Sequence, residues 1–452
     1  MVSPDNASTR SKPLLSRLPT FLALALFAAL AVRQLAFVNR YAVNILYWDQ
    51  WDIYFPLFHH GSLWDVFSLQ HGPHRQGIGF ILTDLLAHLS GWNSRWDAFG
   101  VCGVTIGATA LALLLLRRAK LGSAAALAAV PLLFLNMRQY EMWVGPSNIS
   151  HGAMPMALFM GYCLACFVRD HRWRYPIQAV LTFLLIFTGF GLFVGLIAPV
   201  VMATELVYAW KTGDAGRRAW AVAALVAIAA SWALFAKGYH FEPAVNGFYF
   251  PYKHPVEYFY FAGLMLTNYF GVPGHGAGDI ALGIGILALL LGIAIRRGLP
   301  LLKGDAAAEP LGTVIFALSS YAVIYCLFTA VGRIFIGMDG AAASRYVTLT
   351  ITGAFAILLE LASLPGERLR RSACLVFLAL LLPGTVFLRA DDMGTVHWFS
   401  NGRREWKAVY LKTSNEALAT KESGFHIFPI PIPNRLNYLR RHHLNLFLDA
   451  KH

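Results

Sequence analysis

Ionisable side chains gather in the segment NILYWDQWDIYFPLFHHGSLWDVFSLQHGPHRQ, which occupies residues 44–76 and follows a long apolar run. Its carboxylates Asp49 and Asp52 are three residues apart, so in a helix both project to the same face. Neighbouring carboxylates drive their pKa values apart, and a buried one can act as a general base. We therefore predict a catalytic role for Asp49, Asp52 or both. The alternative is that Trp48 and Trp51 form an interfacial belt while the acids only cap helices.

Basic side chains follow in QHGPHRQ, where His71, His74 and Arg75 lie together. Arginine can grip a phosphate through two hydrogen bonds and histidine can help to neutralise it, so this motif predicts an anion-binding site. Two histidines near two aspartates could also hold a divalent metal, but the spacing matches no zinc signature. Anion binding is thus preferred over a metal site, and a purely structural hydrogen-bond network is the remaining alternative.

Two later motifs carry further polar candidates. RQYEMWVG contains Arg138 and Glu141, and the glutamate is predicted either to pair with an arginine, Arg138 or Arg75, or to orient a sugar hydroxyl. GAAASRY ends in Arg345 and Tyr346 at the start of an apolar run. An arginine at that position suits a lipid phosphate, and the alternative is that it only reaches out to lipid headgroups.

The composition indicates which kind of secondary structure carries these residues. Hydrophobic residues make up 57% of the 452 positions and charged residues only 13%, which is typical of a polytopic membrane protein. The apolar runs lack strict alternation, which favours helices over a barrel. The formal net charge is +13, but the basic residues form short clusters between apolar runs, the pattern that orients membrane helices rather than binds nucleic acid.

Placing the basic clusters in the cytoplasm predicts about eleven crossings, with the amino terminus inside and the carboxyl terminus outside. The predicted spans are 19–38, 97–116, 121–136, 152–168, 176–190, 191–210, 219–236, 279–295, 311–331, 346–363 and 373–388. Three regions follow from this layout: a cytoplasmic tail at 1–18, a transmembrane domain at 19–388, and a small outer tail at 389–452. The domain has outer loops at 39–96 and 237–278. Within them, 76–91 is predicted to be an interfacial helix and 256–271 an interfacial or re-entrant one.

Four motifs together resemble a known family. They are a WDxW-like stretch at 48–51, an HxxHR-like stretch at 71–75, a QYExxWG-like stretch at 139–145 and the RY pair at 345–346. In their order and their shared outer side they resemble a poorly characterised bacterial group within the GT-C superfamily of integral-membrane glycosyltransferases. The similarity extends over most of the membrane portion, whereas the tail after residue 389 has no counterpart.

The resemblance implies an all-α, GT-C-like bundle with interfacial helices and a catalytic aspartate in the first outer loop. It implies a donor sugar on polyprenyl phosphate and no certain cofactor, and it leaves a divalent metal open. It also implies that the protein lies in the bacterial cytoplasmic (inner) membrane with its site facing the periplasm. The implied roles are Asp49 or Asp52 as the base, His71, His74, Arg75, Arg345 and Tyr346 at the donor phosphate, and Trp51, Arg138 and Glu141 at the substrate.

The expected activity is transfer of a hexosyl or pentosyl unit to a hydroxyl of a cell-envelope glycan or lipid, with inversion. If the outer compartment holds no nucleotide sugars, the donor must be anchored in the membrane, and no glycine-rich phosphate motif follows a strand. One alternative is a transporter or flippase of a lipid-linked saccharide, although transporters usually place polar sites at the membrane midplane. The other is a polysaccharide polymerase or ligase with a diphosphate-linked donor, an option that the outer loop at 237–278 keeps open.

Overall fold

The computed structural model describes residues 18–242, 247–272, 274–304, 309–386 and 388–449. Helices form most of this part of the chain, and its one small sheet is a hairpin of β1 (Gln70–His71) and β2 (His74–Arg75). The prediction of an all-α polytopic membrane protein is confirmed at this level. The predicted cytoplasmic tail at 1–18 lies outside the described residues, except for Leu18, where α1 (Leu18–Tyr41) begins.

Eight helices of the described chain are long and apolar enough to cross a membrane. Their ranges are Leu18–Tyr41, Arg95–Arg118, Gly189–Lys211, Ala215–Ala236, Ala277–Leu302, Pro310–Ile336, Ser344–Ala362 and, within the region Glu367–Thr413, the helix Glu367–Val386. The predicted count of about eleven crossings is therefore not confirmed. The other three predicted spans form α7 (Ala124–Phe134), α9 (Ala153–Ala165) and α10 (His171–Ile186). At about 1.5 Å per residue these helices are shorter than a hydrocarbon core roughly 30 Å thick.

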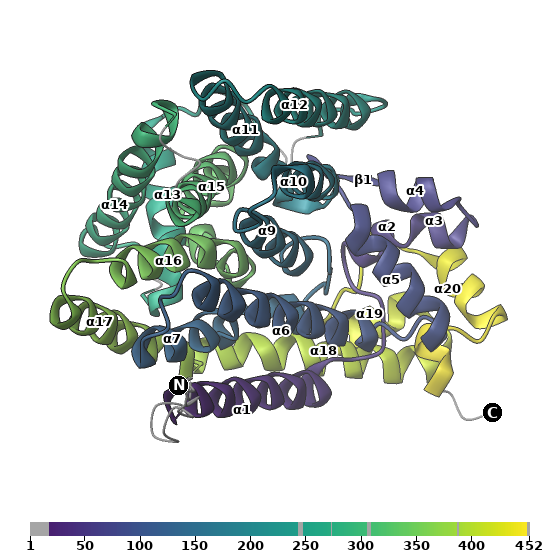
Figure 1. Ribbon diagram of the computed structural model, residues 1–452. Helices are drawn as coiled ribbons and strands as arrows, with labels where there is room; N and C mark the ends of the chain where they lie inside the picture. The colour runs from purple at the N-terminus through teal and green to yellow at the C-terminus, as the bar shows by residue number, and fades with distance from the viewer. Residues whose placement is uncertain (1–17, 243–246, 273, 305–308, 387, 450–452) are drawn as a thin grey trace, which may run out of the picture.

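The helices pack as one bundle with a nearly fully buried centre (Figure 1). α16 (Val347–Ala362) lies in this centre, between α15 (Pro310–Arg333) and α17 (Glu367–Val386). α6 (Arg95–Arg118) packs on α9, while α11 (Val194–Lys211) and α12 (Ala215–Ala236) pair beside α10. This order places α8 (Glu141–Val144), the end of α15, the start of α16 and part of the loop at 39–96 around one region of the molecule.

A short helix occupies the segment predicted to be interfacial or re-entrant. α13 (Val256–Thr267) has 12 residues, about 18 Å of helix, which is too short for a full crossing. It packs on α14 (Ala277–Leu302) and α15. Gly263 and Gly283 make this contact, because a Cβ on either would lie within 2.7 Å of the other helix's backbone. Glycine at both positions thus lets the two backbones meet.

The loop at 39–96, predicted to be the first outer loop, contains short helices. They are α2 (Gln50–Ile53), α3 (Phe55–Phe58), α4 (Leu63–Ser68) and, after the hairpin, α5 (Gly77–Ser90) at the predicted interfacial segment. The tail forms α18 (Ala390–Thr413), α19 (Glu416–Ser423), α20 (Pro433–Arg441) and η9 (Asn445–Asp449). Trp51 and Leu46 of the loop share one hydrophobic core with Trp406 and Leu436 of the tail. Loop and tail therefore form one folded layer, and Figure 1 shows α2–α5 in blue and α20 in yellow at one end of the molecule.

The side chain of Asn445 joins these two segments. Its amide donates to Asn44 Oδ1 at 3.2 Å and to Trp92 O at 2.6 Å, and its Oδ1 accepts from the Leu46 N–H at 3.2 Å. Asn445 is fully buried. Its truncation would leave several buried polar groups without partners, each costing about 1–3 kcal/mol.

Asn445→Ala is therefore expected to lower the free energy of unfolding by about 3 kcal/mol, since more than one buried group loses its partner. Thermal unfolding of the purified protein in detergent measures this change. Asn434→Ala, on the exposed side of α20, is the matched control and should stay within about 0.5 kcal/mol of the wild type. Equal stability of the two variants would contradict the role given to Asn445.

Candidate active site

A cavity of about 480 Å³ lies where the first outer loop meets the ends of several helices. Its walls come from the hairpin, α8 (Glu141–Val144), η3 (Gly189–Phe193), α15, η8 (Ser344–Tyr346) and α18. The ionisable side chains that line it are Asp49, His71, His74, Glu141, His151, Arg333 and Arg345. Aromatic lining is supplied by Tyr47, Trp48, Phe190, Tyr325, Tyr346 and Phe399. This size and mixture are usual for a site that binds a small molecule.

The cavity brings together six of the ten residues predicted for the site. These are Asp49, His71, His74, Glu141, Arg345 and Tyr346. They come from four segments that are far apart in the sequence, and their convergence was expected only from the shared outer side. The other four predicted residues, Trp51, Asp52, Arg75 and Arg138, lie outside the cavity lining.

Asp49 is held as a carboxylate next to an imidazole. It sits at the start of α2, and its Oδ2 lies 3.7 Å from Nε2 of His71. Partial burial acts to raise the pKa of Asp49, but the contact with His71 and the nearby positive charges, Arg345 among them, hold that pKa below its usual range. The Asp49 carboxylate is therefore ionised at neutral pH and faces the cavity.

Three histidine rings line the wall next to Asp49. The ring centroid of His151 lies 6.2 Å from that of His71 and 4.9 Å from that of His74. Burial, together with the neighbouring histidines, places the pKa of His74 well below its usual value. Burial and His71 likewise lower the pKa of His151 to about 3. His74 and His151 are thus neutral at pH 7, so His74 contributes no charge toward a bound phosphate.

The low pKa of His151 makes the stability of the protein depend on pH. An unfolded chain with an ordinary histidine pKa near ~6.5 binds more protons than the folded chain as the pH falls toward 3. As far as His151 determines it, the free energy of unfolding is expected to be constant above about pH 6.5 and to decrease as the pH falls below that value. Thermal unfolding in detergent across that range should show a smaller decrease for His151→Gln. The same slope in both proteins would contradict the neutral state of His151.

Asp52 has different partners from Asp49. Its Oδ1 lies 3.3 Å from Nη1 of Arg435 in α20, and the same guanidinium donates to Trp51 O at 2.7 Å. The Asp52 side chain is 46% exposed. Trp51 is fully buried in the core between loop and tail. The structure thus places Asp49 in the cavity and Asp52 at the contact with the tail.

Arg75 holds the hairpin in place. Its guanidinium donates to the carbonyl oxygens of Phe235, at 2.8 and 3.1 Å, and of Lys237, at 2.7 Å, at the end of α12. It also donates to Ser68 O. Free carbonyls at a helix carboxyl terminus are natural partners for arginine. Arg75 therefore anchors β2, which carries His74, to the end of α12. Its own side chain is not part of the cavity lining.

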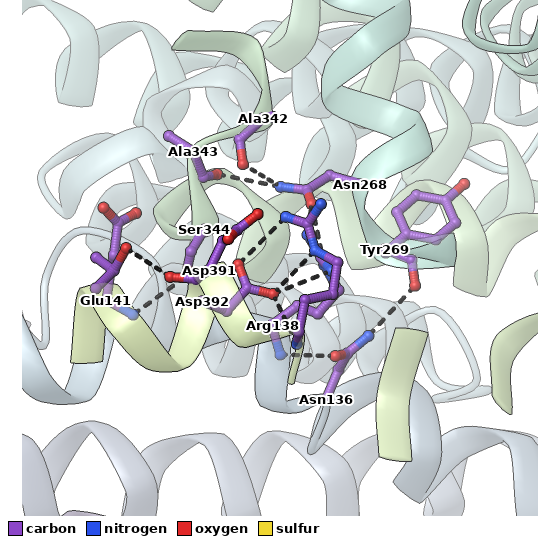
Figure 2. A network of polar contacts seen from close by, with 12 residues as sticks. Asn136, Arg138, Glu141, Asn268, Tyr269, Ala342, Ala343, Ser344, Asp391 and Asp392 are labelled. Atoms are coloured by element: carbon purple, nitrogen blue, oxygen red, sulfur yellow. Dashed lines mark hydrogen bonds and ion pairs between the residues drawn. The ribbon is translucent and has the colours of Figure 1, made fainter. Parts of the chain in front are cut away.

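Arg138 belongs to a buried network beside the cavity, shown in Figure 2. Its Nε and Nη2 donate to Asn268 Oδ1 at 3.0 and 2.7 Å, and its Nη1 lies 3.4 Å from Asp392 Oδ2 of α18. Asn268 Nδ2 in turn donates to Ala342 O at 2.7 Å. Arg138 thus supports, through Asn268, the turn that precedes Arg345.

Glu141 fixes the same turn from the other side (Figure 2). Its backbone N–H donates to Ser344 Oγ at 3.1 Å, and its carboxylate accepts from the backbone N–H of Arg345 at 2.8 Å. The predicted pairing of Glu141 with the Arg138 side chain is not present among the described contacts. Glu141 instead anchors the backbone of Arg345, whose guanidinium lies over the Tyr346 ring at 5.4 Å.

Sequence reasoning did not single out several residues of the cavity. His151 closes the segment 137–151 that also holds Glu141, so its position carried a signal. Phe190 and Phe399 carried none, because aromatic residues are frequent throughout the chain. Phe399 reaches the cavity from the tail, for which no counterpart was identified.

No family model, no curated protein and no solved structure matches this chain. The resemblance to GT-C glycosyltransferases therefore stays a prediction. Within the described ranges, no three His, Cys, Asp or Glu side chains come together in a way that could hold a metal ion.

Proposed function

We propose that the protein is a membrane glycosyltransferase that moves a sugar from a polyprenyl-phosphate carrier to a hydroxyl of a cell-envelope glycan or lipid. One observation supports this most directly: an ionised carboxylate, Asp49, and an arginine, Arg345, line the same cavity. A carboxylate can accept the proton of the attacking hydroxyl. An arginine can form charge-assisted hydrogen bonds with the leaving phosphate. The aromatic walls provide flat, apolar surfaces for the glycosyl unit.

In the proposed step the oxygen of the acceptor hydroxyl attacks the anomeric carbon. The new carbon–oxygen bond forms as the bond to the phosphate oxygen breaks, and its electron pair leaves with polyprenyl phosphate. The hydroxyl proton passes to Asp49 as the bond forms, when that proton becomes acidic. Direct displacement by the acceptor inverts the anomeric configuration, and His71, 3.7 Å away, orients the carboxylate.

Charge on the departing phosphate needs fixed cations. Arg333 and Arg345 both line the cavity. Arg333 is the last residue of α15, and Arg345 lies in η8, directly before α16. A preorganised donor that meets charge as it develops contributes roughly 3–4 kcal/mol. Because the turn at 342–345 is hydrogen-bonded to Asn268 and Glu141, the backbone that carries Arg345 is held in place at the cavity.

The place of the site favours an enzyme over a flippase. Transporters usually hold substrate near the membrane midplane on broken helices. Here the polar cavity is built from the first outer loop, the tail and helix ends. We place this face outside the cytoplasmic membrane of a bacterium, on the basis of the charge distribution between the apolar runs.

The test supplies the purified protein, in lipid nanodiscs, with a panel of radiolabelled polyprenyl-phosphate sugars and cell-envelope glycans. Transfer of label to an acceptor is the expected result. The same donors are given to proteoliposomes to follow their movement between leaflets. Movement without transfer would favour the flippase and overturn the proposal, as would consumption of a diphosphate-linked donor alone.

A further inference from the structure

Trp48 stands at the mouth of the cavity. Its side chain lines the cavity and yet is 41% exposed, and it directly precedes Asp49 in the chain. By contrast, Trp51, one helical turn later, is fully buried in the core. An exposed indole beside an ionised carboxylate calls for an explanation, because large apolar side chains gain free energy from burial.

The backbone at Trp48 does not explain the side chain. Its φ is +53°, in the left-handed region that costs a bulky residue roughly 1–2 kcal/mol. Hydrogen bonds hold this conformation: the Trp48 N–H donates to Ile427 O of the tail at 2.8 Å, and Trp48 O accepts from the Trp51 N–H at 3.0 Å. Glycine would adopt this conformation without the steric cost, so the fold alone does not require an indole here.

The surroundings of Trp48 indicate what enters at this mouth. Its neighbour there is Tyr47, with ring centroids 6.0 Å apart, and Tyr47 in turn contacts Phe399 of α18, with ring centroids 5.7 Å apart. All three rings line the cavity. α18 carries several charged side chains and is too polar to lie in hydrocarbon. The mouth beside Trp48 therefore opens toward water, whereas a lipid alcohol would approach from the bilayer.

We propose that Trp48 is the acceptor subsite and that the acceptor is a carbohydrate whose ring stacks on the indole. This inference rests on the proposed glycosyl transfer and names its acceptor class, a glycan rather than a lipid. One face of a pyranose ring presents C–H groups, which pack against an aromatic face, while its hydroxyls stay in water. Stacking on Trp48 delivers a hydroxyl to Asp49, the next residue along the chain.

The experiment separates acceptor binding from donor use. Trp48→Gly removes the indole at a backbone conformation that glycine accepts, and Trp48→Asn is a second variant that also tolerates positive φ. With a labelled polyprenyl-phosphate sugar and a soluble oligosaccharide acceptor, both variants are expected to raise the acceptor KM at least tenfold. The donor KM and the slow release of free sugar to water should not change.

Trp96→Ala is the matched control, because Trp96 is 49% exposed and lies outside the cavity lining. It should leave the acceptor KM as in the wild type. An unchanged acceptor KM in both Trp48 variants, or an equal rise in donor KM, overturns the subsite. So does a wild-type protein that accepts only lipid alcohols. A wild type that never consumes donor overturns the proposed function itself, and this is seen before any variant is measured.

Discussion

Asp49→Asn is expected to lower the rate of glycosyl transfer by about 10²–10⁴-fold, the usual contribution of a general base. The amide has the shape of the carboxylate and can still contact His71, so the cavity should keep its form. It cannot accept the acceptor's proton. Initial rates with labelled donor and acceptor measure the effect, and donor binding should remain close to that of the wild type.

Asp52→Asn is the matched control for this prediction. Asp52 has the same side chain on the same short segment, but it contacts Arg435 and is 46% exposed. An exposed ion pair contributes about 0–1 kcal/mol, so transfer should stay close to the wild-type rate. If Asp52→Asn abolished transfer while Asp49→Asn did not, the other carboxylate would be the base.

Arg345→Ala is expected to reduce kcat by about 10²–10³-fold, since a fixed donor to developing negative charge is lost. Glu141 accepts from the backbone N–H of residue 345, and this contact survives truncation of the side chain. The turn should therefore stay in place and the donor KM should change less than kcat. Steady-state kinetics with varied donor concentration measures both constants.

Two further variants test whether the loss of rate comes from the guanidinium group of Arg345 itself. Arg345→Lys keeps the charge but not the planar fork, so it should recover only part of the rate. Arg441→Ala removes an exposed arginine from the end of α20 in the same outer layer and should leave kcat unchanged. A rise in donor KM with an unchanged kcat for Arg345→Ala would place this arginine in ground-state binding instead.

Sequence patterns anticipated which polar segments meet, because alternating basic clusters place those segments on one side of the membrane. Asp49, Glu141 and Arg345, which that prediction placed on one side, line a single cavity. The patterns could not show that Arg75 would bind carbonyls at the end of α12, 160 positions away, or that Arg138 would pair with Asp392, 254 positions away. Such contacts depend on how distant elements pack, and no local spacing encodes them.

Three of the predicted crossings are not confirmed for a related reason. Hydrophobicity continues through the ends of α7, α9 and α10, so the apolar runs look longer than the helices. The helices are interrupted by local signals instead: Asn136 caps the turn after α7, and Asp170 caps the start of α10. A polar cap outweighs the surrounding apolar composition, because its side chain satisfies backbone N–H groups that begin a new helix.

The shared core of loop and tail has a consequence for biogenesis. Asn44 and Asn445 are 401 positions apart, yet each completes the hydrogen bonding of the other. During synthesis the loop emerges long before its partner, so the nascent chain must leave the apolar side chains of the loop uncovered until the spanning helices have been inserted. Such late, long-range pairing is slow and open to aggregation. A ribosome-stalled chain that stops before residue 427 lacks Ile427, which binds the Trp48 N–H, so its loop is expected to stay uncovered and to bind chaperones.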